Sequence, residues 1–279
     1  MQVLHVHAPT PVMQRAPSQS ARLLIAPEQF EAHSPFLLMA EDWFAPPAGF
    51  PTHPHRGMET VTLVLEGEVQ HTDHTGANGT LKAGDAQFMT AGHGVMHSEM
   101  PGPGGVHLLQ LWLNLPARLK HVSARYTDLR LNNVPVHTAP GLQARVYAGR
   151  WGGAVQAHGS TWPLSLFDIE IAAGTHAEVP VPAGERAFAV LLSGAVTLAG
   201  TEMQAPKVAW MDIGSTPTPG QHPSADPSFT LHAIQTSRLL VYASPVIDEP
   251  VVAHGPFVMN TRAEIEEAYA DLRSGRLTG

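Results

Sequence analysis

The stretch ETVTLVLEGEVQHTD, residues 59–73, indicates the fold class of this chain. It is rich in Val, Leu and Thr, residue types that are enriched in β-strands. Similar runs recur along the chain between Gly, Pro, Asn or Asp residues, and evenly spaced short strands are typical of sandwiches and barrels. We therefore predict an all-β fold. The further strand-like runs are VHLLQLWLNL (106–115), WPLSLFDIEIAAG (162–174), AFAVLLSGAVTLAG (187–200) and SRLLVYASPV (237–246).

The two halves of the chain resemble each other. When Gly67 is set opposite Gly194, TVTLVLEGEVQ aligns with AFAVLLSGAVT at an offset of 127 residues, and Asp85 falls opposite Asp212. A length of 279 residues also suits two domains of ordinary size. We predict a duplicated β-barrel. Its expected parts are an N-terminal barrel over 1–132, a linker near 133–142, a C-terminal barrel over 143–250 and a tail over 251–279.

The tail carries the one clear helical signal, from Thr261 to about Arg273. Thr261 and Glu264 have the spacing of a capping box, in which two side chains satisfy free amides at a helix start. Gly275 lies where the helix would stop, a position that glycine often occupies. We predict a short C-terminal helix between these signals.

Composition argues against several classes of protein. No run approaches the roughly 20 apolar residues of a membrane span, and the N-terminus lacks the apolar core of a secretory signal. Cysteine is absent, which excludes disulfides and thiolate metal ligands. The net charge of −8, without a basic cluster, argues against direct nucleic-acid binding. We expect a cytoplasmic protein with no membrane association.

Histidine is unusually frequent, with 17 His against 16 Lys plus Arg, and it is the commonest metal ligand. The segment GFPTHPHRGMETVT places His53 and His55 two residues apart, and TAGHGVMHSEMP gives His97 and Glu99 the same spacing. Residues i and i+2 of a strand project from one face. If the two strands are neighbours in a barrel, three imidazoles and one carboxylate converge on one ion.

Ligand type restricts the metal only partly. Nitrogen and oxygen donors without sulfur suit Fe, Mn, Co, Ni, Cu or Zn. Four protein ligands leave up to two positions open on an octahedral ion for a small molecule or O2. Other nearby histidines fit coordination less well: His93 sits between two glycines in a predicted turn, and His71 and His74 bracket a predicted hairpin end where we expect exposure.

The second half provides an internal comparison. At the 127-residue offset, His53 and His55 correspond to Pro180 and Pro182, which cannot bind a metal. Near the position that matches the second pair, the chain reads QHPSADPS (221–228), without a His-x-Glu pair. We therefore predict one ion per chain, held by the N-terminal barrel.

Four segments closely resemble the pirin family of two-barrel cupins. They are HPHRGMETVT (53–62), TAGHGVMHSEMP (90–101), LQLWLNLP (109–116) and EPVVAHGPFVMNT (249–261). The resemblance implies two cupin, jelly-roll-like β-barrels packed face to face, with a mononuclear metal in the N-terminal one. The ligands it implies are the two His of the first motif and the His and Glu of the second, here His53, His55, His97 and Glu99.

Two nearby residues complicate this assignment. In many cupins the first motif also supplies a Glu ligand, which makes Glu59 a rival of Glu99. We prefer Glu99 because it shares the i,i+2 geometry with His97, and we leave Glu59 as a group that could orient an imidazole. Met58 stands where the family usually has Phe, a change that could reshape the pocket mouth without altering the ligands.

The resemblance implies two functions. Many pirin-like proteins are described as quercetin 2,3-dioxygenases, which open the flavonol ring with O2 and release carbon monoxide. Others are regulators: eukaryotic nuclear members as transcription cofactors with iron, and some bacterial members through metabolic enzymes. We favour the enzyme, with Glu99 also acting as the catalytic proton acceptor, over a metal-binding regulator that contacts a protein partner.

The expected ligands and partners follow from this choice. We expect one mononuclear divalent transition metal, with iron placed ahead of Ni, Mn, Co, Cu and Zn. The substrates would be a small aromatic, flavonol-like molecule and O2, and the chain would act as a monomer. Hydrophobic side chains near the motifs could line a pocket for a flat ring, with ordinary barrel core as the alternative: Met58, Phe88, Met89 and Met96.

Overall fold

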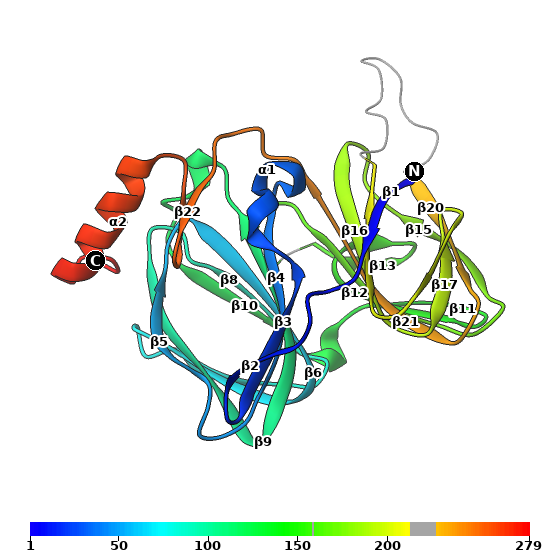
Figure 1. The fold of residues 1–279 in the computed structure, drawn as a ribbon, viewed down its shortest axis with the longest axis horizontal. Coiled ribbons are helices and arrows are strands. Elements are labelled where there is room, and N and C mark those ends of the chain that lie inside the picture. The colour runs from blue at the N-terminus through cyan, green and yellow to red at the C-terminus, as the bar shows by residue number, and fades with distance from the viewer. Residues whose placement is uncertain (158, 213–226) are drawn as a thin grey trace. The chain divides into compact units, whose positions relative to one another are not determined.

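The computed structural model describes residues 1–157, 159–212 and 227–279. The chain divides into two compact units. The unit that we call the N-terminal barrel comprises residues 10–132 and 247–279, and the C-terminal barrel comprises residues 1–9 and 133–246. Both consist almost entirely of antiparallel strands, which confirms the predicted all-β class (Figure 1).

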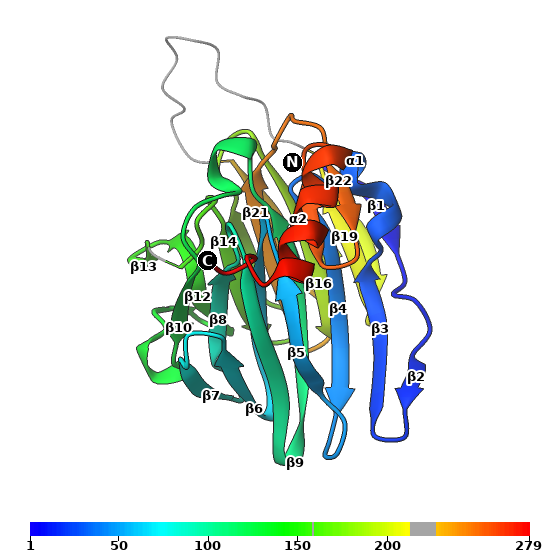
Figure 2. The same ribbon diagram turned by 90° about the vertical axis from the view of Figure 1, so that its left-hand side faces the viewer.

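The N-terminal barrel is built on one large sheet with the strand order β10-β8-β6-β9-β4-β3-β2; β5 adds to β9, and β7 adds to β6. In Figure 2 the strands β4, β3 and β2 follow one another across this sheet. Its elements are β2 (Met13–Ala16), β3 (Gln19–Ile25), η1 (Pro27–Gln29), α1 (Phe30–His33), β4 (Phe36–Phe44), β5 (Phe50–His55), β6 (Met58–Asp73), β7 (Asn78–Lys82), β8 (Ala86–Thr90), β9 (Val95–Asn114), η2 (Ala117–Leu119), β10 (Arg125–Leu129), β22 (Val252–His254), β23 (Phe257–Met259) and α2 (Arg262–Ser274). The short helix η3 (Leu131–Asn133) lies at the boundary between the units.

The C-terminal barrel combines a sheet of order β1-β19-β16-β21-β14-β12-β11, with β13 on β12, and a second sheet of order β15-β20-β17-β18. Alternate side chains of these strands fill one apolar core, in which Phe167, Ala189 and Val241 are buried. Its elements are β1 (Val3–His7), β11 (Val136–Ala139), β12 (Leu142–Trp151), β13 (Ala154–Gln156), β14 (Ser165–Ile171), β15 (His176–Pro180), β16 (Glu185–Ser193), β17 (Ala195–Leu198), β18 (Thr201–Gln204), β19 (Lys207–Met211), β20 (Ser228–Ala233) and β21 (Ser237–Pro245).

The division between the units differs from the expected boundaries. The first residues belong to the C-terminal barrel, because β1 pairs with β19 and the amide of Gln2 donates to Asp212 Oδ1 over 2.7 Å. The expected linker over 133–142 contains β11, which pairs with β12 and so extends the barrel sheet. The expected separate tail over 251–279 is part of the N-terminal barrel. Sequence position alone could not reveal these long-range pairings.

The C-terminal tail is attached to the first histidine motif. Arg56 forms an isolated parallel bridge with Phe257, and its guanidinium lies 2.9 Å from Asp271 Oδ2 on α2. The backbones meet so closely that a Cβ on Gly57 would lie 2.1 Å from the carbonyl oxygen of Val258. Glycine is required at this position because any side chain would displace the tail.

The predicted C-terminal helix is confirmed as α2. The Thr261 hydroxyl accepts a hydrogen bond from the Glu264 amide, and the Glu264 carboxylate accepts one from the Thr261 amide. Gly275 ends the helix in the left-handed conformation, at a φ of 72°. Figure 1 shows α2 beside β22. Within the described residues, no helix is long and apolar enough to cross a membrane.

Candidate metal centre

The first three predicted ligands come together inside the N-terminal barrel. β5 and β9 are antiparallel neighbours, and their register sets His53 opposite His97. His55 projects from the same face two residues further along β5. The three side chains each offer a ring nitrogen such that all three atoms lie within 4.8 Å of one another. An ion at their centre would therefore have three nitrogen donors.

Burial keeps these rings in the neutral form that binds metal. His55 and His97 are buried, and His53 is partly exposed. Desolvation lowers the pKa of His55 to about 3, with the neighbouring His53 acting in the same direction. Desolvation also lowers the pKa of His53, and it lowers that of His97 far below its ordinary value. At neutral pH each ring therefore keeps a lone pair available for coordination.

Hydrogen bonds at Nδ1 leave the Nε2 atoms of His53 and His97 available. The Nδ1 of His53 lies 2.9 Å from the carbonyl oxygen of Pro51, which can only accept, so Nδ1 carries the proton. The Nδ1 of His97 lies 2.7 Å from the Nε2 of His71. Among the described residues, neither ring nitrogen of His55 nor the Nε2 of His97 has a hydrogen-bond partner, although these atoms are buried. Unsatisfied buried donors or acceptors are costly, and a bound ion would satisfy them.

His71 is a site residue that sequence reasoning missed. We expected exposure at a hairpin end, but the structure buries His71 against the ring of His97, with ring centroids 4.9 Å apart. The reason is that β6 continues through two irregularities in register, and its far end pairs again with β9. His74, three residues later, is exposed as expected.

Glu99 lies near the three histidines but is held by another partner. It is buried, and both carboxylate oxygens lie 3.0 Å from Nε2 of Gln110. Its oxygens are not in the group of ligand atoms that lie within 4.8 Å of one another. Desolvation raises the pKa of Glu99 to about 7, and the hydrogen bond from Gln110 acts against this.

Glu59 belongs to the opposite face of β6. Gln110 Nε2 lies 3.3 Å from Thr62 Oγ1, so the side chain of Thr62 shares the face of Glu99. Glu59 precedes Thr62 by three residues in a regular ladder and therefore points the other way. Its carboxylate accepts a hydrogen bond of 2.7 Å from Thr90 Oγ1. This position does not suit the suggested role of orienting an imidazole of the cluster.

The other residues considered from the sequence lie in a turn or pack in apolar clusters. His93 lies in a turn, with Nδ1 3.2 Å from the carbonyl oxygen of Val122. The apolar side chains that could have lined one pocket pack in separate places: Met58 against Leu37 and Val258, Met89 with Ala91 and Val95, and Met96 against the tail cluster that contains Phe257. Phe88 is buried as well.

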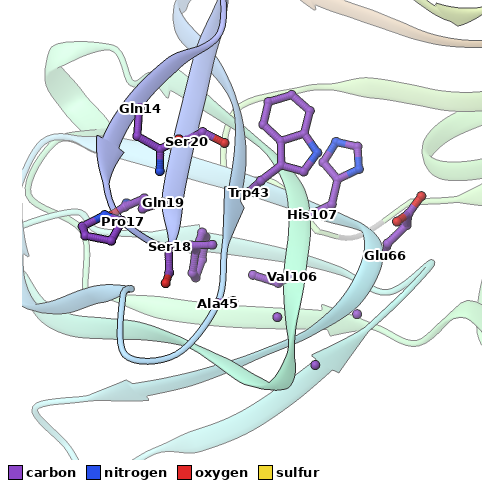
Figure 3. A pocket seen from close by; sticks show the side chains of 14 residues that line it. Gln14, Pro17, Ser18, Gln19, Ser20, Trp43, Ala45, Glu66, Val106 and His107 are labelled. Atoms are coloured by element: carbon purple, nitrogen blue, oxygen red, sulfur yellow. The ribbon is translucent and has the colours of Figure 1, made fainter.

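Two cavities of the N-terminal barrel, both formed by described residues, are not lined by the three histidines. A cavity of about 440 Å³ in the same barrel lies beside Trp43 and His107, whose rings stack with centroids 4.6 Å apart (Figure 3). A smaller cavity of about 130 Å³ is lined by His71, Tyr126 and Asp128, and it therefore lies beside the ring that contacts His97. The large cavity is therefore a separate feature, whereas the small one adjoins the candidate centre.

The C-terminal barrel has prolines where the N-terminal barrel has its first histidine pair. Pro180 ends β15, and Pro182 follows it. Within the described parts of the chain, the three histidines form the only group of three or more potential ligands that lie this close. Most of the stretch expected opposite the second pair, residues 221–226, lies outside the described residues.

Paired β-barrels, one of them with histidines converging from adjacent strands, define the class of two-domain cupins. Residues 17–113 match the family described as Pirin, and residues 166–278 match the Pirin C-terminal cupin domain. The chain belongs to the pirin family, as its motifs predicted.

Relatives and solved structures agree with this assignment. A Pseudomonas aeruginosa protein named "Putative quercetin 2,3-dioxygenase" is 37% identical, over 99% of this chain and 97% of the relative. The structure of an Acinetobacter baumannii quercetin 2,3-dioxygenase is similar with a TM-score of 0.87 and 30% identity, covering 99% of this chain and 98% of that one. A bacterial pirin from Escherichia coli in complex with nickel(II) shares the fold, with a TM-score of 0.65 and 20% identity. The match covers 87% of this chain and 100% of the Escherichia coli chain.

Proposed function

We propose that this chain is a metal-dependent dioxygenase that opens the ring of flavonol-like substrates with O2 and releases carbon monoxide. The observation that carries the proposal is the convergence of His53, His55 and His97, with ligand atoms within 4.8 Å, inside a barrel. The substrate class rests on the names of the Pseudomonas and Acinetobacter relatives.

The donor set fits one divalent transition metal. The Nε2 atoms of His53 and His97 and a ring nitrogen of His55 would hold it, and Glu99 would supply the fourth donor by exchanging its bond from Gln110 for the ion. An ion bound there would act as a Lewis acid toward the deprotonated hydroxyl of the substrate and would bring the substrate close to O2. Nitrogen and oxygen donors suit iron, which we propose, as well as Ni, Mn, Co, Cu or Zn.

Residues around the three histidines would accept the substrate proton and hold the ligands in position. Glu99 is the carboxylate that would accept the proton of the substrate hydroxyl, because it lies two residues from His97 on the same strand face. Gln110 orients Glu99 through its amide, and the indole Nε1 of Trp112 lies 3.4 Å from the Gln110 side-chain oxygen. The indole also meets the ring of His55 edge to face, with centroids 5.2 Å apart. The contact between the Trp112 and His55 rings would hold one imidazole of the proposed donor set in place.

The test combines metal analysis with turnover. Protein purified without added metal is analysed for its elements, then incubated with quercetin in air and without O2. We expect one redox-active ion per chain and consumption of quercetin only in air, with carbon monoxide released. The His97→Ala variant should lose both ion and turnover, whereas His93→Ala, in the neighbouring turn, should retain both. Absence of turnover of any flavonol by the metal-loaded protein would overturn the proposal.

A further inference from the structure

The C-terminal barrel contains a cavity that the proposed function does not use. Its volume is about 260 Å³, and an adjoining cavity of about 270 Å³ shares four of its lining residues. Such a space accommodates a small organic molecule. The shared residues are Gly149, Ala157, Ser165 and Pro182.

Glu185 is the buried polar group of this cavity. It begins β16, where Ala187 and Ala189 belong to the barrel core, so the alternation of the strand directs Glu185 to the interior. Only 9% of the residue is exposed. Its Oε2 atom is buried and has no hydrogen-bond partner among the residues that the structure describes. A carboxyl group is rarely buried without a partner, which points to a missing ligand.

The cavity also lies where the duplicated fold places the counterparts of the first histidine pair. Pro180 and Pro182, which correspond to His53 and His55 at the 127-residue offset, line the two adjoining spaces. Prolines supply no side-chain donor, and the metal-type cluster of the described residues lies in the other barrel. The C-terminal barrel thus keeps a pocket without the first pair of metal-binding side chains, so an organic ligand fits it better than an ion.

The residues that line the cavity indicate that the ligand is positively charged. Desolvation raises the pKa of Glu185 to about 7, and no cation of the described residues opposes this effect. A ligand with a positive charge and N–H donors would compensate the buried carboxylate most completely. Trp162 also lines the cavity, with its indole fixed by a hydrogen bond of 3.0 Å to the carbonyl oxygen of Pro245, and indole rings attract cations.

We propose that the cavity of the C-terminal barrel binds a small organic cation, a primary ammonium compound, through the carboxylate of Glu185. The hydroxyl of Ser165, which by strand alternation also faces the interior, is an acceptor for a second N–H. Arg150 lines only the adjoining cavity, so the ammonium group belongs in the space beside Glu185.

The experiment titrates benzylamine into the metal-free full-length protein by calorimetry at neutral pH. Chelator treatment removes the alternative that the amine binds an ion in the other barrel. We expect saturable binding of one benzylamine, weakened about tenfold or more in Glu185→Gln, because charge-assisted bonds are the strong ones. Glu202→Gln, which removes an exposed carboxylate of the same barrel, should bind like the unmodified protein.

A second variant and two neutral or anionic analogues complete the test. Ala157→Phe leaves Glu185 intact but narrows both cavities from an exposed position, and it should also abolish binding. Circular dichroism would establish that each variant is folded. Benzyl alcohol and benzoate should bind at least tenfold more weakly than benzylamine. Equal affinity in Glu185→Gln, stronger binding of benzoate, or no binding of benzylamine would each overturn the proposal.

Discussion

The Nε2 atom of His71 lies 2.7 Å from the Nδ1 atom of His97, and the two rings come from adjacent strands, β6 and β9. A hydrogen bond from His97 Nδ1 to His71 leaves Nε2 of His97 free to face its two partners on β5. His71 therefore sets the tautomer and the orientation of one proposed ligand without itself belonging to the three-histidine group.

Replacing His71 should weaken metal binding. His71→Phe keeps a ring of similar size but removes the acceptor of the His97 proton, so we expect a loss of about 10- to 100-fold in metal affinity. Competition with a chromogenic chelator measures this loss. His74→Phe changes an exposed residue near the same hairpin and should leave the affinity unchanged. Equal affinities in the two variants would refute the role of His71.

Substitutions of the two candidate carboxylates, Glu99 and Glu59, should have different effects. Glu99→Gln keeps the size of the side chain but removes the charge, and we expect it to lower metal affinity. Glu59→Gln should retain the metal and instead lower the free energy of unfolding by about 1–3 kcal/mol, because it disturbs the buried hydrogen bond from Thr90. Metal content and urea unfolding distinguish them. Loss of metal in Glu59→Gln but not in Glu99→Gln would reverse our assignment.

Because Gly57 contacts the tail so closely, we expect Gly57→Ala to lower the stability of the protein strongly. An alanine at Gly57 would meet both a φ of +79° and the carbonyl oxygen of Val258. Gly76→Ala is the matched control, because Gly76 has a φ of +85° and no described atom within 4 Å of an added Cβ. The control should cost about 1–2 kcal/mol from backbone strain alone. Urea unfolding should give a larger loss for Gly57→Ala, with faster proteolysis of the tail; equal losses would contradict the contact.

Asp42 should make stability depend on pH. Burial, with Glu41 nearby, raises the pKa of Asp42 from 3.8 to about 6, so the folded protein binds more protons than the unfolded chain between these values. This contribution to stability is therefore present below pH 3.8, is lost as the pH rises to about 6, and stays lost above it. In metal-free protein, Asp42→Asn should flatten the profile over this range and add on the order of 3 kcal/mol at pH 7. Exposed Asp248→Asn should leave the profile unchanged.

Metal stoichiometry tests the difference between the barrels. With Pro180 and Pro182 in place of the first histidine pair, the C-terminal barrel should add no ion, and titration should saturate at one per chain. The double variant His53→Ala with His97→Ala should bind none. A second ion of similar affinity in the unmodified chain would contradict this expectation.

Local patterns predicted the local features. Thr261, Glu264 and Gly275 define the helix α2 because a capping box and a left-handed glycine act within a few residues. The i,i+2 spacing of His53 and His55 was likewise readable, since alternation along a strand fixes the face. The domain boundaries were not readable, because they depend on β1 pairing with β19 and on the tail meeting Arg56, contacts between residues far apart in the chain.

The sequence by itself determined the all-β class, the family, the C-terminal helix and the histidines that converge, because each rests on a motif or a short repeat. Only the tertiary structure decided that His71 is buried beside His97, that Glu59 faces away from Glu99, and that Glu185 lies in a cavity of the second barrel. These three outcomes depend on strand register, and register is set by bulges and by packing across the whole sheet rather than by neighbouring residues.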